Sequence, residues 1–186
     1  MNLKYIIAII AIILTVTIGG IVIYMNLPSS EEIVDVSQLA DEYSFGISNS
    51  GSSCRNMYQE FIPSVNNISN VRFRAFTATT IDFDLVFELR EKDPSGKLLH
   101  TESFVPSQMT NTRQWFDVQM DVDVTPGETY CITFANTPDQ GDSFGYDVAV
   151  TRSDLYTDGD FYATFDGGAV WTKQAYDLAF EVCGYK

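Results

Sequence analysis

The sequence predicts an all-β fold, an antiparallel β-sandwich, preceded by one N-terminal transmembrane helix. Phe and Tyr are abundant, at 13 and 10 residues, and both types favour strands over helices. From Tyr58 onward, apolar and polar residues alternate with a period of two, which is typical of strands with one buried face. Before this region, 21 consecutive positions carry no charged residue.

The uncharged run, YIIAIIAIILTVTIGGIVIYM, occupies residues 5–25. At a helical rise of ~1.5 Å per residue, it covers the ~30 Å hydrocarbon core of a bilayer. It is longer than the roughly 7–15 apolar residues of a cleaved signal peptide, and no Ala-x-Ala cleavage site follows it. We therefore expect an uncleaved signal-anchor that inserts into the lipid bilayer.

Charge predicts the orientation of this anchor. Lys4 and the α-amine precede the apolar run, whereas Glu31 and Glu32 follow it. Under the positive-inside rule, residues 1–4 stay in the cytoplasm and everything after Met25 is extracellular. The expected location is the cell membrane, crossed once.

Residues 26–55 are expected to form an extracellular stalk or linker. EEIVDVSQLADEY (31–43) is compatible with a short amphipathic turn or helix. GISNSGSSC (46–54) has the Gly and Ser content of a flexible linker. The folded domain is therefore expected at residues 56–186.

Strands and turns alternate through this domain. The stretches with period-two alternation are 71–76, 83–91, 115–124, 130–136, 144–150, 160–165 and 175–182. Turn signals separate them, namely DPSG (93–96), TPGE (125–128), TPDQGD (137–142) and DGG (166–168). Roughly eight to ten short strands with half-buried patterning predict an antiparallel sandwich.

Four segments in order resemble a known module: YQEFIPS, DFDLVFELRE, VTPGETYCITF and YTDGDFYATFDGGAVWTKQAYDLAFEV. Together, over about residues 56–185, they are similar to the jelly-roll, carbohydrate-binding-like modules of bacterial and archaeal surface and secreted proteins. The resemblance implies a jelly-roll β-sandwich with a non-catalytic role in glycan binding or adhesion. It indicates the architecture better than the ligand, because one fold carries many functions.

Composition excludes or disfavours several function classes. Acidic residues outnumber basic ones 25 to 11, for a net charge of −14, whereas nucleic-acid binding requires an excess of Lys and Arg. The single histidine, His100, gives little support to His-based metal catalysis or a Ser-His-Asp triad. No phosphate-binding loop or nucleophile elbow occurs. We expect no enzyme, although a carboxylate pair across a cleft would be invisible in the sequence.

Three cysteines follow the predicted anchor, where an oxidising environment favours disulfides. In jelly rolls the first and last strands usually pair antiparallel. With Phe61 beside Leu178, that pairing would bring Cys54 close to Cys183, and we expect a disulfide between them. Cys131 is then a small buried thiol, or the bonding partner if the register differs.

The resemblance also implies a structural Ca²⁺ between the first and last strands, with Gln59 and Asp177 as contributors. Calcium takes six to eight oxygen ligands, several of them backbone carbonyls from turns. Further candidate carboxylates in the turns are Asp139, Asp142, Asp158, Asp160 and Asp166. The alternative is that these are ordinary turn aspartates.

Aromatic residues supply the candidate ligand site. Alternation places Trp115 on the polar face that also carries Asp117 and Gln119, so it is a candidate platform for stacking on a sugar ring. A Trp that covers a sheet edge is the alternative. Trp171 and Tyr176 are further candidates, either as a rim of the site or as a cap on the core.

One sequon, Asn67-Ile68-Ser69, offers a site for N-glycosylation in an extracellular domain. Taken together, the sequence predicts a membrane-anchored, extracellular, non-catalytic β-sandwich that binds glycan or another cell-envelope component. The alternatives are a structural or assembly subunit of the envelope or of a membrane complex, and a glycan-active enzyme.

Overall fold

The computed structural model describes residues 31–47, 54–77, 81, 83–136, 145–153, 155–166 and 169–186. Within these ranges the chain is built of antiparallel strands and one short 3-10 turn, Pro106–Gln108. Residues 32–186 form one compact unit. The described ranges contain no helix long and apolar enough to cross a membrane, and the anchor predicted at residues 5–25 lies outside them.

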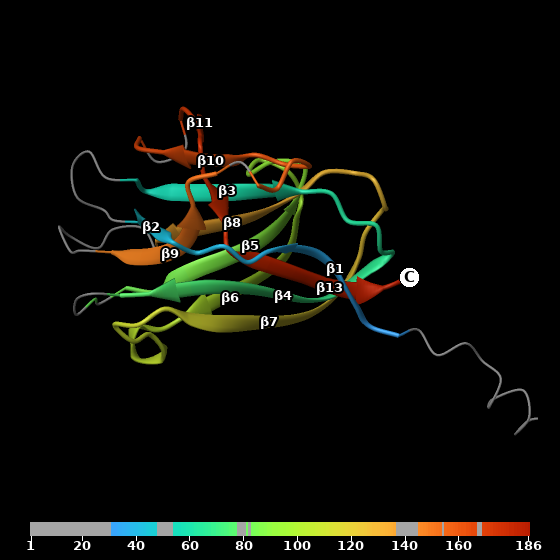
Figure 1. Ribbon diagram of the computed structural model, residues 1–186, viewed down its shortest axis with the longest axis horizontal. Coiled ribbons are helices and arrows are strands. Elements are labelled where there is room, and N and C mark those ends of the chain that lie inside the picture. Colours follow the sequence, from blue (N-terminus) through green and yellow to red (C-terminus); the bar gives the residue numbers. More distant parts are fainter. Residues whose placement is uncertain are drawn as a thin grey trace, which may run out of the picture. The chain divides into compact units, whose positions relative to one another are not determined.

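The first sheet has seven strands: β1 (Ile33–Gln38), β2 (Tyr43–Ile47), β4 (Asn67–Phe76), β7 (Gln114–Asp123), β9 (Tyr146–Thr151), β12 (Asp177–Leu178) and β13 (Phe180–Tyr185). Strand β4 is central, because β7 pairs with one side of it and β13 and β9 pair with the other. Strands β1 and β2 form the outer edge against β13 and β9 (Figure 1).

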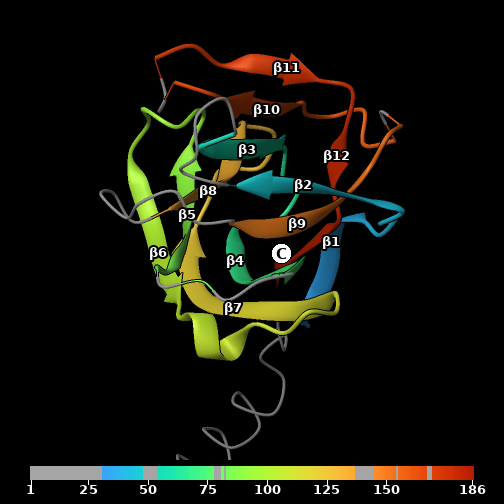
Figure 2. The same ribbon diagram turned by 90° about the vertical axis from the view of Figure 1, so that its left-hand side faces the viewer.

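The second sheet has six strands: β11 (Thr172–Gln174), β10 (Phe161–Thr164), β3 (Asn56–Phe61), β8 (Tyr130–Asn136), β5 (Leu85–Glu91) and β6 (Leu98–Phe104). They pair antiparallel in this order, so strands distant in the sequence become neighbours (Figure 2). The antiparallel two-sheet sandwich predicted from the sequence is confirmed.

The core lies between the two sheets and is rich in phenylalanine. Phe73 of β4 packs against Phe134 of β8, with ring centroids 4.7 Å apart, and stacks on Phe87 of β5. All three side chains are fully buried. Each strand turns one face to this core, which is the physical basis of the period-two alternation in the sequence.

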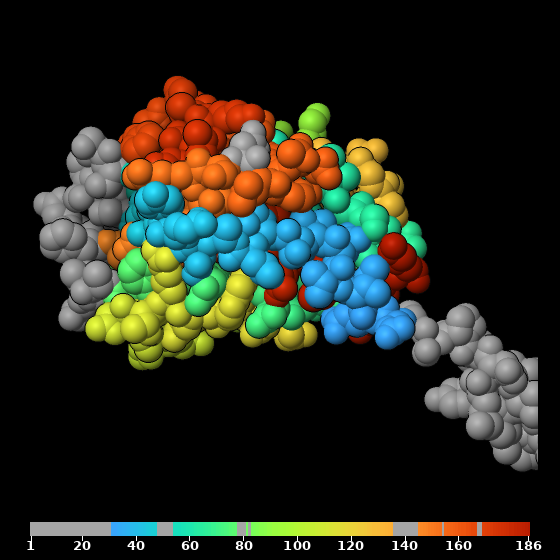
Figure 3. All heavy atoms as spheres, viewed as in Figure 1, coloured from blue at the N-terminus to red at the C-terminus, as the bar shows by residue number. Residues whose placement is uncertain are grey.

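The predicted stalk at residues 26–55 is wrong over much of its length. Ile33–Gln38 and Tyr43–Ile47 are strands of the first sheet, and Val36 and Ile47 are buried in its core. In Figure 3 this segment, blue to cyan, lies along the surface of the domain. Its apolar residues are too few to distinguish a strand from a helical turn until β13 and β9 supply the partners.

The predicted disulfide is also wrong. Cys54, Cys131 and Cys183 are free, buried thiols, and burial raises the pKa of Cys54 to about 12. The premise of the pairing fails because β3 pairs with β8 and β10, so that Phe61 lies opposite Tyr130. Strand β3 begins at the end of the sandwich opposite to that at which β13 ends (Figure 1).

Candidate functional site

Trp115 lies on the outer face of the first sheet, as the alternation predicts. Its neighbours Phe116 and Val118 are buried, whereas Asp117 and Gln119 are exposed. The ring of Trp115 is already in contact with other side chains, however. The guanidinium carbons of Arg72 and Arg74 on β4 lie 5.1 and 5.4 Å from its centroid.

These two arginines are part of a ladder of ion pairs across the first sheet. Arg72 Nε lies 2.7 Å from Asp117 Oδ1, and its Nη1 donates to Glu181 Oε2 at 2.6 Å. Arg74 pairs with Asp41 in the connection between β1 and β2. Trp115 and Asp117 therefore belong to a surface network that joins strands, and neither lines a pocket described below.

The structure separates Trp171 from Tyr176. Trp171 lies half-buried on the outer face of the second sheet, edge-on to Tyr58, with centroids 4.9 Å apart. Tyr58 in turn stacks on Tyr162 at 4.7 Å. Tyr176 instead packs against Phe45 beside the core, at 5.5 Å. Of these two residues, Trp171 is the one that faces outward from the second sheet.

The register of the second sheet aligns a row of side chains on the outer face. From one edge to the other, the row contains Thr101, Glu88, Thr133, Tyr58, Tyr162 and Lys173. Cross-strand neighbours of this kind are close enough to interact directly. The row combines one carboxylate, two threonine hydroxyls, two tyrosine rings and one ammonium group, and this alignment is known only once the strand order is known.

A pocket of about 260 Å³ opens over this row. Its lining includes Asn56, Glu88, Pro94, Ser95, Thr133 and Trp171. Trp171 and the β5–β6 hairpin turn both line the pocket, together with residues of β3, β5 and β8 that form its floor. The pocket therefore combines an aromatic surface with polar groups that accept and donate hydrogen bonds.

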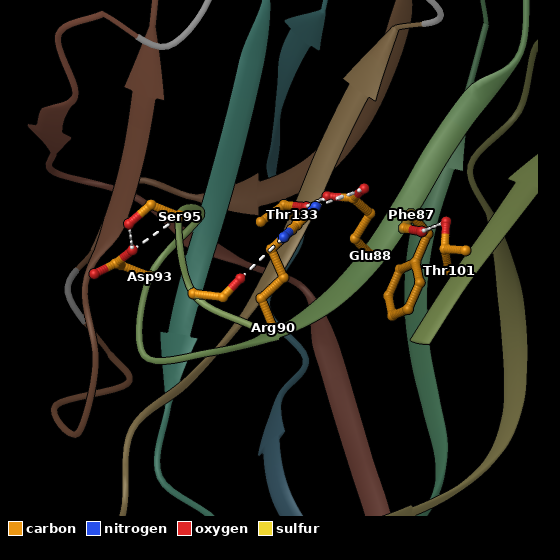
Figure 4. Close-up of polar contacts among 8 residues, drawn as sticks. Phe87, Glu88, Arg90, Asp93, Ser95, Thr101 and Thr133 are labelled. Carbon is orange, nitrogen blue, oxygen red and sulfur yellow. Dashed lines mark hydrogen bonds and ion pairs between the residues drawn. The ribbon is translucent and has the colours of Figure 1, made fainter. Parts of the chain in front are cut away.

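Glu88 is the acidic group of the pocket floor, and Arg90 holds it in place (Figure 4). Arg90 Nε donates to Glu88 Oε2 at 2.7 Å, and Nη2 donates to Oε1 at 3.1 Å. The Thr133 hydroxyl donates to Oε2 at 3.2 Å. The hydrogen bond that Arg90 donates to Glu88 raises the pKa of Arg90, so the guanidinium stays charged. A carboxylate offers about four acceptor positions, so about one remains for a ligand.

The β5–β6 turn that lines the pocket has an unusual backbone. Lys92 has a φ of 67°, and the Asp93 amide donates back to the Glu91 carbonyl at 2.7 Å, which together describe a γ-turn of the rare, strained type. Asp93 Oδ1 then accepts hydrogen bonds from the Ser95 amide and hydroxyl, at 2.8 and 2.5 Å. These hydrogen bonds, that of the hydroxyl above all, lower the pKa of Asp93.

Gly96 closes the turn, and no other residue fits there. A Cβ at Gly96 would lie 1.7 Å from the Glu91 carbonyl oxygen. The Gly96 carbonyl accepts a hydrogen bond from Arg90 Nη1 at 3.0 Å, which fastens the turn to the sheet (Figure 4). We refer to Asp93–Gly96 as the hook, because it places Pro94 and Ser95 over the pocket.

Gln59 contacts Leu178, the residue after Asp177, and hydrogen bonds within the protein engage both of the proposed calcium contributors. Gln59 Oε1 accepts from the Leu178 amide at 3.0 Å, joining the two sheets. Asp177 Oδ2 accepts from the amides of Leu155 and Tyr156, at 2.6 and 2.9 Å. Both side chains are buried and fasten the connection between β9 and β10. Among the residues that the structure describes, no three His, Cys, Asp or Glu side chains are grouped to hold a metal.

The other candidate carboxylates are dispersed. Asp160 pairs with Lys173 at 2.5 Å, and Asp166 accepts from the Thr164 hydroxyl at 2.6 Å. Asp158 is exposed in the connection between β9 and β10. Asp139 and Asp142 lie outside the described residues.

The sequon lies on a central strand rather than on a loop. Asn67 is half-buried in β4, and its Nδ2 donates to Asp121 Oδ1 at 2.8 Å and to Asp123 Oδ1 at 3.3 Å. Ser69 is buried and donates to Glu32. Attachment of a glycan to Asn67 Nδ2 would replace one of the two amide hydrogens, so at least one of these hydrogen bonds would be lost.

No family model and no curated sequence matches the chain. One similar solved structure is a family 6 carbohydrate-binding module of Clostridium stercorarium in complex with cellobiose, at 16% identity and a TM-score of 0.36, covering 64% of this chain and 89% of that one. A second is a family 43 arabinoxylan arabinofuranohydrolase of Bacillus subtilis in complex with cellotetraose, at 10% identity and a TM-score of 0.36.

A third is infectious bursal disease virus, Gt strain, at 12% identity and a TM-score of 0.41, covering 84% of this chain. The chain spans 28% of the arabinofuranohydrolase and 36% of the viral chain. At these TM-scores the likeness carries no functional argument.

Proposed function

We propose that this domain is a non-catalytic glycan-binding module and that its ligand occupies the pocket between Trp171 and the hook. The observation that carries the proposal is the composition of that pocket. Trp171 offers an aromatic surface, on which the C–H face of a sugar ring stacks, while Glu88 and Thr133 lie on the floor for the hydroxyls. Ligand sites commonly combine apolar walls with a few fixed polar groups in this way.

The size of the pocket suits a small part of a glycan. At about 260 Å³ it falls slightly below the ~300–1,000 Å³ of pockets for larger small molecules, so one sugar ring or a chain end fits. An aromatic contact contributes on the order of 1 kcal/mol beyond burial. Binding is therefore weak at one site, and many copies displayed by the predicted membrane anchor would raise it through avidity.

The arrangement of the acidic groups favours binding over hydrolysis. Glycoside hydrolysis by the usual route needs two carboxyl groups about 5–10 Å apart on either side of the scissile bond. Among the described residues that line the pocket, Glu88 is the one carboxylate, and it is held by Arg90 and Thr133. This supports the non-catalytic proposal.

A protein partner from the cell envelope is the second candidate. Phe165 and Val170, which flank the connection between β10 and β11 close to Trp171 in the sequence, are 45% and 62% exposed. Contiguous patches of exposed apolar side chains are typical of surfaces that bind other proteins. The binding experiment below separates the two candidates, because only a glycan-binding module retains purified sugars.

The test is a glycan array probed with the full chain, purified in a detergent without a sugar headgroup. We expect the wild type to bind a subset of neutral glycans and Trp171→Ala to lose this binding. Trp115→Ala is the matched control on the first sheet, and it should retain binding, since it removes only the contacts with Arg72 and Arg74. Loss of binding in Trp115→Ala, or its retention in Trp171→Ala, would place the site elsewhere.

A further inference from the structure

We infer that Arg90 makes the pocket selective for uncharged sugar residues, by neutralising Glu88 on the floor and by holding the hook that forms the wall. This inference rests on the proposed function and specifies its ligand class. Arg90 is a positioning residue, because it acts through Glu88 and the hook rather than on the ligand.

Arg90 neutralises the charge of Glu88 on the pocket floor. Two nitrogens of Arg90 face the two oxygens of Glu88, at 2.7 and 3.1 Å, in a bidentate pair. Bidentate pairing of this kind fixes the orientation of both groups as well as their charge. The pair presents no net charge to the pocket, and the position left on Glu88 accepts a hydrogen bond from a neutral hydroxyl.

Arg90 also holds the hook, which forms a wall of the pocket. The third nitrogen of Arg90, Nη1, donates to the Gly96 carbonyl at 3.0 Å, so one guanidinium binds floor and hook together. The strained backbone at Lys92 persists only while its surroundings hold it, and this hydrogen bond is one of the contacts that do so. Loss of Arg90 would therefore change the charge of the floor and the position of the wall together.

The surroundings of the pocket are negatively charged. Two further acidic groups, Glu60 and Asp93, lie on or beside the same face of the sheet, whereas Asp160 on that face is paired with Lys173, and the whole chain has a net charge of −14. This field repels anionic ligands such as uronic acids. The same field attracts a cationic amino sugar, but such a sugar would have to displace Arg90 in order to pair with Glu88. Uncharged sugars meet neither obstacle.

The test uses three matched probes, glucose, glucuronic acid and glucosamine, immobilised as terminal residues, with the galacto and manno series in parallel. We expect the wild type to prefer the neutral member of whichever series it binds. Arg90→Gln exposes the charge of Glu88, so the ratio of amino-sugar to neutral-sugar binding should rise about tenfold, as for a charge-assisted hydrogen bond. The double variant Glu88→Gln/Arg90→Gln should restore the neutral preference, which a merely structural role for Arg90 would not produce.

The outcomes separate this inference from the proposed function. If the wild type binds no sugar in any series, the proposed function fails and the inference with it. If it binds sugars but takes the uronic acid or amino sugar as well as the neutral one, the inference alone is wrong. An unchanged ratio in folded Arg90→Gln also overturns it.

If Arg90→Gln does not fold, the Arg90→Lys variant decides, because it keeps the positive charge but cannot reach both Glu88 and Gly96. It should bind several-fold more weakly with the neutral preference intact, and a lost preference contradicts the inference.

Discussion

Glu60 lies beside the row of the second sheet that forms the pocket floor, and its raised pKa links folding to pH. Burial, and after it the neighbouring carboxylates of Asp160 and Asp93, raise the pKa of Glu60 above its ordinary value. The ionised form therefore destabilises the fold at any pH above the raised pKa. This penalty decreases as the pH falls through that value, and it is absent below the ordinary Glu pKa of about 4.3.

Glu60→Gln should accordingly raise the melting temperature at pH 7–8 and lose this advantage near pH 4. The Asp160 amide donates a hydrogen bond to Glu60 Oε2 at 3.4 Å, and the oxygen of a Gln side chain would still accept it. Thermal melts of both proteins across pH 4–8 measure the effect. Glu128→Gln, on an exposed turn, is the control and should show little pH dependence relative to wild type. Identical curves for Glu60→Gln and wild type would show that Glu60 is better solvated than the structure indicates.

At the scale of single elements, the sequence predicted the strand faces well and the contacts on them poorly. Alternation along β7 correctly placed Trp115 on the outer face, since a period of two depends only on the strand itself. The contacts of the Trp115 ring with Arg72 and Arg74 depend on which strand lies next to β7, and no local sequence pattern predicts that neighbour. The same reason hid Glu88, Arg90 and Thr133, whose roles follow from the pairing of β5 with β8.

The β5–β6 hairpin supplies a prediction at this scale. Lys92 adopts a φ of 67°, where a side chain costs about 1 kcal/mol or more relative to glycine. Lys92→Gly should therefore be more stable than Lys92→Ala by about 1 kcal/mol, because both remove the Lys side chain and only glycine relieves the backbone. Urea unfolding of the two variants measures the difference. Equal stability, or a more stable alanine variant, would mean that the turn relaxes away from this geometry.

At the scale of the whole molecule, the antiparallel sandwich was predictable and its limits were not. Repeated alternation and turn signals after residue 58 indicate many strands, whatever their order. The start of the domain was misplaced because β1 and β2 are short and acquire their burial only from distant partners, β13 and β9. The Cys54–Cys183 disulfide was wrongly predicted for a related reason. It depended on one assumed pairing between the first and last strands, and the actual pairing of β3 is with β8 and β10.

The corrected boundary yields the last prediction, a comparison of residues 32–186 with residues 56–186. The shorter fragment is the domain expected from the sequence, but it lacks β1 and β2, which together cover the edges of β13 and β9. It also loses the buried side chains of Val36 and Ile47.

Uncovered strand edges with apolar side chains beside them promote aggregation. We expect residues 32–186 to be soluble and to unfold in one cooperative transition, and residues 56–186 to aggregate or to melt at a clearly lower temperature. Circular dichroism melts and size-exclusion chromatography of the two fragments measure this. A fragment of residues 56–186 that is monomeric and melts with the longer one would show that β1 and β2 are accessory to the fold, and the stalk interpretation would then be restored.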